Sequence, residues 1–296
     1  MITVDQAVAR ITQGFAALGT ERVALGEAAG RVLAEDAVAK FDQPPAPMSA
    51  MDGYAVRAAD AKLGAELTVI GDAPAGRPYS GKVSQGQAVR IFTGGVVPEG
   101  ADAVVIQEDT ALQGARVVIR ETPRPNENVR ARGLDFRAGD ALLKRGHRLN
   151  ARDVALLAAA DHATVAVTRK PRVALVATGD ELSRPGEQRK PGGIVASSTY
   201  ALQAMIKNWG GEAVDAGILP DRPEAFADIS GLTKTADLIV TTGGASVGDH
   251  DLVQSALAPQ GFMLDFWKIA MRPGKPLIFG RLRETPLIGQ IGRAHV

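Results

Sequence analysis

The sequence predicts a multidomain α/β protein that combines a parallel α/β sheet domain, an inserted β-rich module and a small mixed N-terminal domain. Its 296 residues suit two or three domains. After Pro171, short apolar runs alternate with helical patterns and glycine-rich loops, as in parallel sheets covered by helices. Between residues 39 and 137, glycine and proline separate short β-type runs, which predicts the β-rich module.

The first element is a helix near the N-terminus. Thr3 and Gln6 have the spacing of a capping box. The apolar residues that follow at helical spacing are Val4, Val8, Ile11 and Phe15. We assign residues 1–38 and 138–170 to the N-terminal and linker domain.

The β-rich module, residues 39–137, precedes a second helix. Its expected strands cover residues 67–70, 88–92, 103–106 and 116–119, and another short strand is expected at 142–147. Asn150 is the expected N-cap of a helix over 151–160, with Asp153 in its first turn, where the helix dipole favours an acid.

Residues 171–289 carry the strand, loop and helix alternation. The apolar run 173–177 is typical of a strand buried on both faces. A helix starting at Ser198 has one apolar face made of Leu202, Met205, Ile206 and Trp209. Further elements are expected as a strand at 213–218, a helix at 223–235 and a strand at 238–242. Helices should cover both sides of this sheet.

Composition excludes several classes of function. With 34 basic and 33 acidic residues, the net charge of +1 gives no field that favours nucleic acid or a membrane surface. There is no cysteine, so thiol catalysis and disulfides are excluded, and the four histidines have no zinc-binding spacing. Aromatic residues make up only 4% of the chain, which predicts an aliphatic core. The absence of targeting signals favours a cytoplasmic location.

Two glycine loops follow predicted strands of the α/β domain, where ligands bind in open sheets. The first, 177–182, contains Thr178, Gly179 and Glu181, and the second, 241–248, contains Gly243, Gly244, Ser246 and Gly248. Such loops point backbone N–H groups at anions. Asp249 and Asp251 follow the second loop and offer the oxygen ligands that suit Mg²⁺. Either loop alone reads as a strand-to-helix turn, whereas two in one sheet favour a binding site.

Other charged residues have two interpretations each. Asp221 follows a strand and is either the N-cap of the next helix or part of the site. Lys268, Arg272 and Lys275 surround a turn, where they either hold a phosphate or form a solvated basic edge.

The β-rich module has three polar turns of its own. Residues 44–57 place Asp52 among small residues, and Gly53 there permits backbone geometry that residues with a Cβ rarely adopt. Thr93 opens a glycine pair that is equally well explained as a hairpin turn. Arg130 and Asp135 lie in a charged turn, which is either part of a site or an exposed linker between modules.

Six strings, spread in order over nearly the whole chain, resemble the MoeA/gephyrin family of molybdopterin molybdenumtransferases. They are SAMDGYAVR, RIFTGGVVPEGADAVV, VRARGLDFRAGD, VALVATGDEL, TTGGASVGDHD and FWKIAMRPGKP. The resemblance implies an elongated dimer that acts on adenylated molybdopterin, releases AMP with Mg²⁺ and inserts molybdate as substrate. Molybdopterin adenylyltransferase and apo-molybdoenzymes are further implied partners.

The resemblance also implies the roles of residues. Catalytic acids fall on Asp52, Asp135, Glu181, Asp221 and Asp251, of which Glu181 and Asp251 are the implied metal ligands. The implied substrate-binding residues are Thr93, Arg130, Thr178, Gly179, Gly243, Gly244, Ser246, Gly248, Lys268, Arg272 and Lys275. The family's dimer implies that Asp52 reaches the site from the partner subunit.

The chain departs from the family pattern at two places. Arg272 stands where a lysine is frequent, which keeps the charge but changes the donor geometry. The family continues after residue 289 into a C-terminal β domain, whereas this sequence ends at Val296. We therefore expect residues 290–296 to be an artefactual tail on a truncated gene.

Two other functions compete with the transferase. A non-catalytic scaffold of the same fold would not need the five acids, because buried charge is costly unless it is used or paired. Adenylyl transfer to molybdopterin would need only the α/β domain, so the N-terminal β-rich module argues against it.

Overall fold

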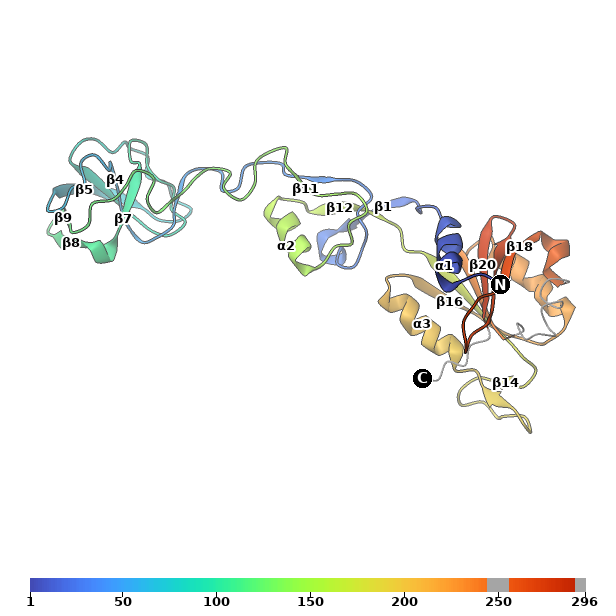
Figure 1. The fold of residues 1–296 in the computed structure, drawn as a ribbon. Coiled ribbons are helices and arrows are strands. Elements are labelled where there is room, and N and C mark those ends of the chain that lie inside the picture. The colour runs from blue at the N-terminus through green and yellow to red at the C-terminus, as the bar shows by residue number, and fades with distance from the viewer. Residues whose placement is uncertain (244–255, 291–296) are drawn as a thin grey trace. The chain divides into compact units, whose positions relative to one another are not determined.

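A computed structural model of the chain divides into two compact units, and it describes residues 1–243 and 256–290 (Figure 1). The first unit consists of Met1–Arg22, Gly30–Ala34 and Ala166–Val296. The second consists of Val23–Ala29 and Glu35–Val165. Each unit has its own sheet and its own core. The four-part domain division expected from the sequence stays a prediction.

A six-stranded sheet with the order β16-β13-β17-β20-β19-β18 forms the centre of the first unit. The first four strands in that order are parallel, as the alternating pattern predicts. β19 is antiparallel to both of its neighbours, so the sheet is mixed, which the sequence did not predict. The bounds are β13 Arg172–Thr178, β16 Glu212–Leu219, β17 Leu238–Thr242, β18 Phe262–Lys268, β19 Pro276–Leu282 and β20 Thr285–Gln290.

Both faces of this sheet are covered, as expected. On one face, Ile206 of α3 (Ser198–Asn208) packs with Val173, Leu175 and Val240. Its expected apolar partners Met205 and Trp209 are exposed, so only part of the predicted helix face is buried. On the other face lie η3 (Pro223–Asp228) and α4 (Ile229–Leu232), where one longer helix was predicted.

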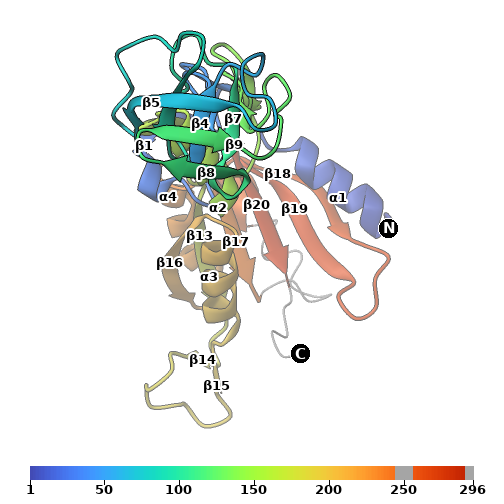
Figure 2. The same ribbon diagram turned by 90° about the vertical axis from the view of Figure 1, so that its left-hand side faces the viewer.

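Helix α1 (Val4–Gln13) has the predicted capping box between Thr3 and Gln6. It lies along β18 and β19, where Ala7 packs with Phe266, Ile269 and Phe279 (Figure 2). Of the apolar residues at helical spacing, Ile11 packs against this cluster, whereas Val4, Val8 and Phe15 are exposed. The small Ala7 faces the sheet because its short side chain allows the helix to approach the rings of the two phenylalanines.

The remaining elements of the first unit are short. β14 (Leu182–Ser183) pairs with β15 (Ile194–Val195), and η4 covers Ala258–Gln260. β1 (Thr20–Ala24) pairs with β12 (Thr164–Thr168), and the boundary between the two units passes through this pair. Within residues 1–243 and 256–290, no helix is both long and apolar enough to span a membrane.

The second unit contains a six-stranded sheet with the order β7-β4-β6-β5-β9-β8. Its parallel neighbours are β5 and β6, and the other pairs are antiparallel. The bounds are β4 Gly53–Val56, β5 Glu66–Ala73, β6 Gln87–Ile91, β7 Ala103–Ile106, β8 Thr110–Gln113 and β9 Arg116–Ile119. β7 and β9 coincide with predicted β-type runs, β5 includes the run 67–70, and β6 overlaps the run 88–92 with a shift of one residue.

Two antiparallel pairs extend from this sheet, β3 (Met48–Ser49) with β10 (Val129–Arg130) and β2 (Ala37–Val38) with β11 (Ala141–Leu143). Asn150 is the N-cap of helix α2 (Ala151–Ala159) and Asp153 lies in its first turn, as predicted, and the two side chains also form a capping box that was not predicted. Short 3-10 turns occur at η1 (Leu25–Glu27) and η2 (Gln107–Asp109). The core clusters of the β-sheet are mainly Ala, Val, Leu and Ile, which confirms the aliphatic core.

Gly53 is the first residue of β4, which pairs with β7. A Cβ added to this residue would lie 1.9 Å from the carbonyl oxygen of Val105. Its φ is not in the left-handed region, so the expectation of unusual backbone geometry is wrong. Glycine is required here because the two strands approach too closely for any side chain.

We predict that Gly53→Ala destabilises the second unit by about 2–3 kcal/mol, because strands must separate to admit the methyl group. Urea unfolding measures this difference. Gly26→Ala is the matched control, because a Cβ there meets nothing within 4 Å, and its effect should stay within about 0.5 kcal/mol. Equal stability of the two variants would contradict the steric account.

A partly exposed ion pair connects the residues that precede β13 and β17 in the first unit. Arg169 donates two hydrogen bonds to the Asp237 carboxylate, of 2.7 and 2.5 Å, and the Arg172 N–H adds a third of 2.8 Å. These donors, Arg169 first, hold the pKa of Asp237 below its ordinary value. A carboxyl with a lowered pKa stabilises the fold above its unfolded pKa and loses that effect as pH falls through the folded value.

Asp237→Asn should therefore lower the free energy of unfolding by about 1–2 kcal/mol at pH 7. The difference from the unmodified chain should begin to shrink as the pH falls below the ordinary carboxyl pKa of about 4, and it should keep shrinking as the pH falls through the lowered pKa of the folded state. Urea titrations from pH 3 to 7 measure it. Asp265→Asn removes an exposed ion pair with Arg10 and should cost at most about 0.5 kcal/mol. A loss that does not change with pH would contradict this prediction.

Candidate functional site

The carboxyl ends of five strands of the first sheet lie at one edge. β16, β13, β17 and β20 are parallel, and β18 runs in the same direction because two antiparallel pairings separate it from β20. This carboxyl edge collects most of the predicted site residues of the first unit. They are Thr178, Gly179, Glu181, Asp221, Gly243, Lys268, Arg272 and Lys275.

The ends of β13 and β17 are in direct contact. Gly243 has a φ of 91°, and a Cβ there would lie 2.3 Å from the Thr178 carbonyl oxygen. Gly179 donates its N–H to the Leu219 carbonyl at 3.1 Å, which joins this point to the end of β16. Gly243 is thus required by both conformation and space. The structure brings these two predicted glycine positions together.

The hydroxyl of Thr178 is the most unusual group at this edge. The side chain is 3% exposed, and its Oγ1 has no hydrogen-bond partner in the part of the chain that the structure describes. A buried hydroxyl without a partner costs free energy, so such groups are rare outside functional sites. Thr178 therefore has an unused donor and acceptor beside the two glycines.

Glu181 folds back over the same point. A Cβ on Gly179 would lie 2.6 Å from Oε2 of Glu181, so the carboxylate covers that glycine. Its backbone is held in place because Ile194 donates its N–H to the Glu181 carbonyl at 2.9 Å. Asp221 follows the end of β16, whose Leu219 is paired with Thr178. Glu181 follows the end of β13 and Asp221 follows the end of the adjacent β16, so both acids lie near Thr178.

The predicted cations lie at the other end of this edge. Lys268 ends β18, with Nζ 3.3 Å from the centroid of the Trp267 ring, and Arg272 and Lys275 are exposed in the turn before β19. No carboxylate pairs with any of the three among the described residues. Four strand spacings separate β13 from β18, which is about 19 Å. A ligand that contacts both groups must be long.

Four predicted site residues, Gly244, Ser246, Gly248 and Asp251, lie outside the described residues, as do residues 291–296 of the expected tail. Within the described ranges, no group of three or more His, Asp and Glu side chains is arranged to hold a metal. Mg²⁺ commonly binds through one or two carboxylates and keeps waters or substrate phosphates as its other ligands. Glu181 and the unpartnered Thr178 hydroxyl are oxygen donors of that kind.

In the second unit, Asp52 and Thr93 are bonded to each other. Oδ1 of Asp52 accepts from the Thr93 backbone N–H at 2.7 Å and from its hydroxyl at 2.8 Å. These two donors, with a smaller contribution from the charge of Arg90, hold the pKa of the Asp52 carboxyl below its ordinary value. The turn at Thr93 therefore does not only connect strands, because its two hydrogen bonds hold the Asp52 carboxylate in place.

β3 holds the surrounding loops together. Ser49 donates its N–H to the Gly95 carbonyl at 2.8 Å and accepts from the Gly94 N–H at 2.9 Å. Its neighbour Met48 is paired with Arg130 on β10. Asp52, Thr93 and Arg130 are thus gathered around one short strand pair.

Asp135 lies in the second unit beside Gln43 rather than beside the β3–β10 pair. Its N–H donates to the Gln43 carbonyl at 2.8 Å, several residues before β3. The structure of the second unit does not bring Asp135 into contact with Asp52.

The four predicted acids within the described residues, Asp52, Asp135, Glu181 and Asp221, are all exposed. The argument that they represent costly buried charge is therefore wrong. Exposure instead makes their carboxylates accessible to a ligand.

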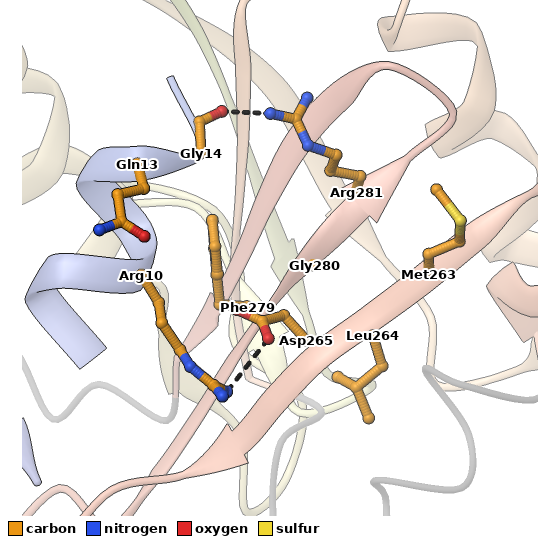
Figure 3. Close-up of a pocket in the computed structure, with 9 residues that line it drawn as sticks. All are labelled: Arg10, Gln13, Gly14, Met263, Leu264, Asp265, Phe279, Gly280 and Arg281. Carbon is orange, nitrogen blue, oxygen red and sulfur yellow. Dashed lines mark hydrogen bonds and ion pairs between the residues drawn. The ribbon is translucent and has the colours of Figure 1, made fainter. Parts of the chain in front are cut away.

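A hollow of about 540 Å³ lies between α1 and the strands β18 and β19, and it contains none of the predicted site residues (Figure 3). Arg10 forms an ion pair of 3.1 Å with Asp265 across it, and Arg281 donates to the Gly14 carbonyl. Its charged groups are thus already satisfied by the chain.

Arg90 is a residue next to Asp52 that no sequence motif indicated. Its guanidinium donates to the Gly53 carbonyl at 3.3 Å and to Oε1 of Gln107 at 2.7 Å. The available signal was a single charged residue inside the otherwise apolar predicted strand 88–92.

Comparison with known proteins gives two matches that together cover most of the chain. Residues 2–160 match the MoeA N-terminal region (domain I and II), and residues 174–291 match a probable molybdopterin binding domain. A molybdopterin molybdenumtransferase of Nostoc sp. is 44% identical over 90% of this chain, which spans 63% of that relative's length. One from Haemophilus influenzae is 37% identical over 99% of this chain, which spans 73% of it.

A solved structure also resembles this chain over nearly its whole length. The molybdopterin biosynthesis MoeA protein of Pyrococcus horikoshii superposes with a TM-score of 0.85 at 34% identity. That alignment covers 98% of this chain and 74% of the Pyrococcus protein.

We predict that Thr93→Val raises the pKa of Asp52, because the carboxylate loses one of its two donors from Thr93. The pKa should stay below its ordinary value, because the backbone N–H of residue 93 still donates. Carbon-detected NMR titration of the carboxyl groups measures the change. Thr110→Val is the control, because that hydroxyl donates to the Gln107 carbonyl instead. An unchanged Asp52 pKa would count against the assigned hydrogen bond.

Proposed function

This chain belongs to the MoeA family, and from that membership we propose that it acts as a molybdopterin molybdenumtransferase. In this proposal the substrates are adenylated molybdopterin and molybdate. The reaction inserts molybdenum into the pterin dithiolene and releases AMP in the presence of Mg²⁺. It is one step in the biosynthesis of the molybdenum cofactor.

The observation that carries the proposal is the chemistry of the carboxyl edge of the first sheet. The buried Thr178 hydroxyl, which has no partner among the described residues, lies with Gly179 and Gly243 at one end. Three cations without carboxylate partners among the described residues lie about 19 Å away. A long substrate with phosphates between two ring systems has complementary groups at that spacing. This favours a nucleotide conjugate such as adenylated molybdopterin over a small anion.

The cations have a direct role in this proposal. Cleavage of a phosphoanhydride places additional negative charge on the phosphate oxygens in the transition state. Lys268, Arg272 and Lys275 would bind these oxygens. Arg272 is suited to two parallel hydrogen bonds with a phosphate, whereas lysine acts as a point charge.

Glu181, together with Asp251 from outside the described residues, is the proposed ligand set for Mg²⁺. The oxygen donors of Glu181 and Thr178 at this edge fit a hard cation. When bound, Mg²⁺ would neutralise charge on the phosphoanhydride oxygens. Asp221 would orient an attacking oxygen, and Gly243 allows the ends of β13 and β17 to come together beside Thr178.

Asp52, Thr93, Arg130 and Asp135 would contribute to the same reaction from the β-rich unit. The proposal includes a homodimer in the cytoplasm, as the family resemblance implies. A molybdopterin adenylyltransferase would supply the substrate, and apo-molybdoenzymes would receive the product. The β-rich unit favours this reaction over adenylyl transfer, because residues 2–160 match the MoeA N-terminal region.

We predict that the chain releases AMP from adenylated molybdopterin when Mg²⁺ and molybdate are present, and that Glu181→Gln lowers the rate at least about 100-fold. Quantifying AMP by chromatography, and molybdenum bound to the product, measures both parts of the reaction.

Glu212→Gln is the matched control. Glu212 is an exposed acid at the opposite, amino end of β16, and its variant should stay within about twofold of the unmodified chain. Equal losses in the two variants would contradict the assigned site. If a folded chain releases no AMP but converts molybdopterin with ATP, adenylyl transfer is the function instead.

A further inference from the structure

We propose that Arg90 is a positioning residue that fixes Asp52 and Thr93 in their bonded arrangement. The effect of Arg90 on the reaction rests on the proposed function, whereas its effect on the geometry of Asp52 and Thr93 does not. The geometric part concerns the second unit alone and has its own readout.

Arg90 is half-buried on β6, and its side chain makes four specific contacts. Nη1 donates to the Gly53 carbonyl at 3.3 Å, and Nη2 donates to Oε1 of Gln107 at 2.7 Å. The centre of the guanidinium lies 5.0 Å from the Tyr54 ring centroid and 5.1 Å from that of Phe92. Such stacking attracts a cation to the ring faces and restricts its movement.

Three of these four contacts lead to residues that adjoin or bond to the Asp52–Thr93 pair. Gly53 follows Asp52 in the chain, and Phe92 precedes Thr93. Gln107 accepts from Arg90 through its side chain and donates its own N–H to the Asp52 carbonyl at 3.0 Å. Arg90 therefore connects the backbone on both sides of the Asp52–Thr93 hydrogen bonds.

The charge of Arg90 also remains available to Asp52. No carboxylate pairs with Arg90 in the described part of the chain, whereas Arg116 on the same sheet is paired with Glu66 at 3.0 Å. A cation without a closer anion acts on the nearest carboxylate, and Arg90 contributes to the low pKa of Asp52. The Arg90 side chain thus affects Asp52 both through its contacts and through the electrostatic effect of its charge.

The first experiment uses NMR of the full chain. Arg90→Met keeps most of the side-chain volume and removes the cation and its hydrogen bonds. We expect the pKa of Asp52 to rise and the Thr93 amide to exchange faster with solvent. Arg90→Lys keeps the charge but not the two-armed contact, so the pKa should rise less while the amide still exchanges faster.

Arg116→Met is the matched control, because it removes an ion-paired arginine from β9 of the same sheet. It should change neither the Asp52 pKa nor the exchange of the Thr93 amide. If Arg90→Met leaves both unchanged in a folded chain, the inference is overturned. If Arg90→Met does not fold, the same measurements on Arg90→Lys decide.

The second experiment separates this inference from the proposed function. In the AMP-release assay, Arg90→Met should lower the rate about tenfold, but it should have no further effect when Asp52→Asn is already present. Additive losses would overturn the positioning role. A chain that shows the NMR changes but never releases AMP would refute the proposed function and keep the geometric inference.

Discussion

The direction of the strands in the first sheet is the constraint on which the candidate site depends. Parallel pairing of β13 with β16 and β17 forces Leu219, Thr178 and Thr242 to end at the same edge. The contact between Gly243 and the Thr178 backbone exists because these ends are adjacent. The antiparallel β19 then allows β18 to run in the same direction as β20, which adds the cations of the following turn to this edge.

In the second unit, the close approach of two strands at Gly53 restricts the position of the candidate acid Asp52. Its strands β4 and β7 approach until only glycine fits at residue 53, and Asp52 immediately precedes that point. The acid is therefore attached to one of the most restricted backbone positions of the unit. Hydrogen bonds from Thr93 and the contacts of Arg90 complete this restriction from the neighbouring strand. Rigid placement of this kind is typical of residues that act on a ligand.

Local sequence signals predicted local structure well. The capping box at Thr3, the N-cap at Asn150 and the strands 103–106, 116–119 and 238–242 are confirmed, because capping chemistry and apolar periodicity determine them. Tertiary packing decided the rest. The exposed Val8 and Trp209 show that periodicity locates a helix but not which side chains meet the sheet. Motifs identified the family and Thr178, whereas the stacking of Arg90 between two rings requires contacts that no spacing reveals.

The hydrogen bonds of Asp52 have one stereochemical consequence. Both donors of Thr93 use Oδ1, and Oδ2 has no donor among the described residues. The carboxylate is therefore an asymmetric group, with one oxygen anchored and the other open in a fixed orientation. It presents a single acceptor to an incoming hydroxyl, amine or cation, so recognition there is monodentate and directional. A glutamate at this position would move that acceptor by one methylene length and lose the alignment, although the charge would be the same.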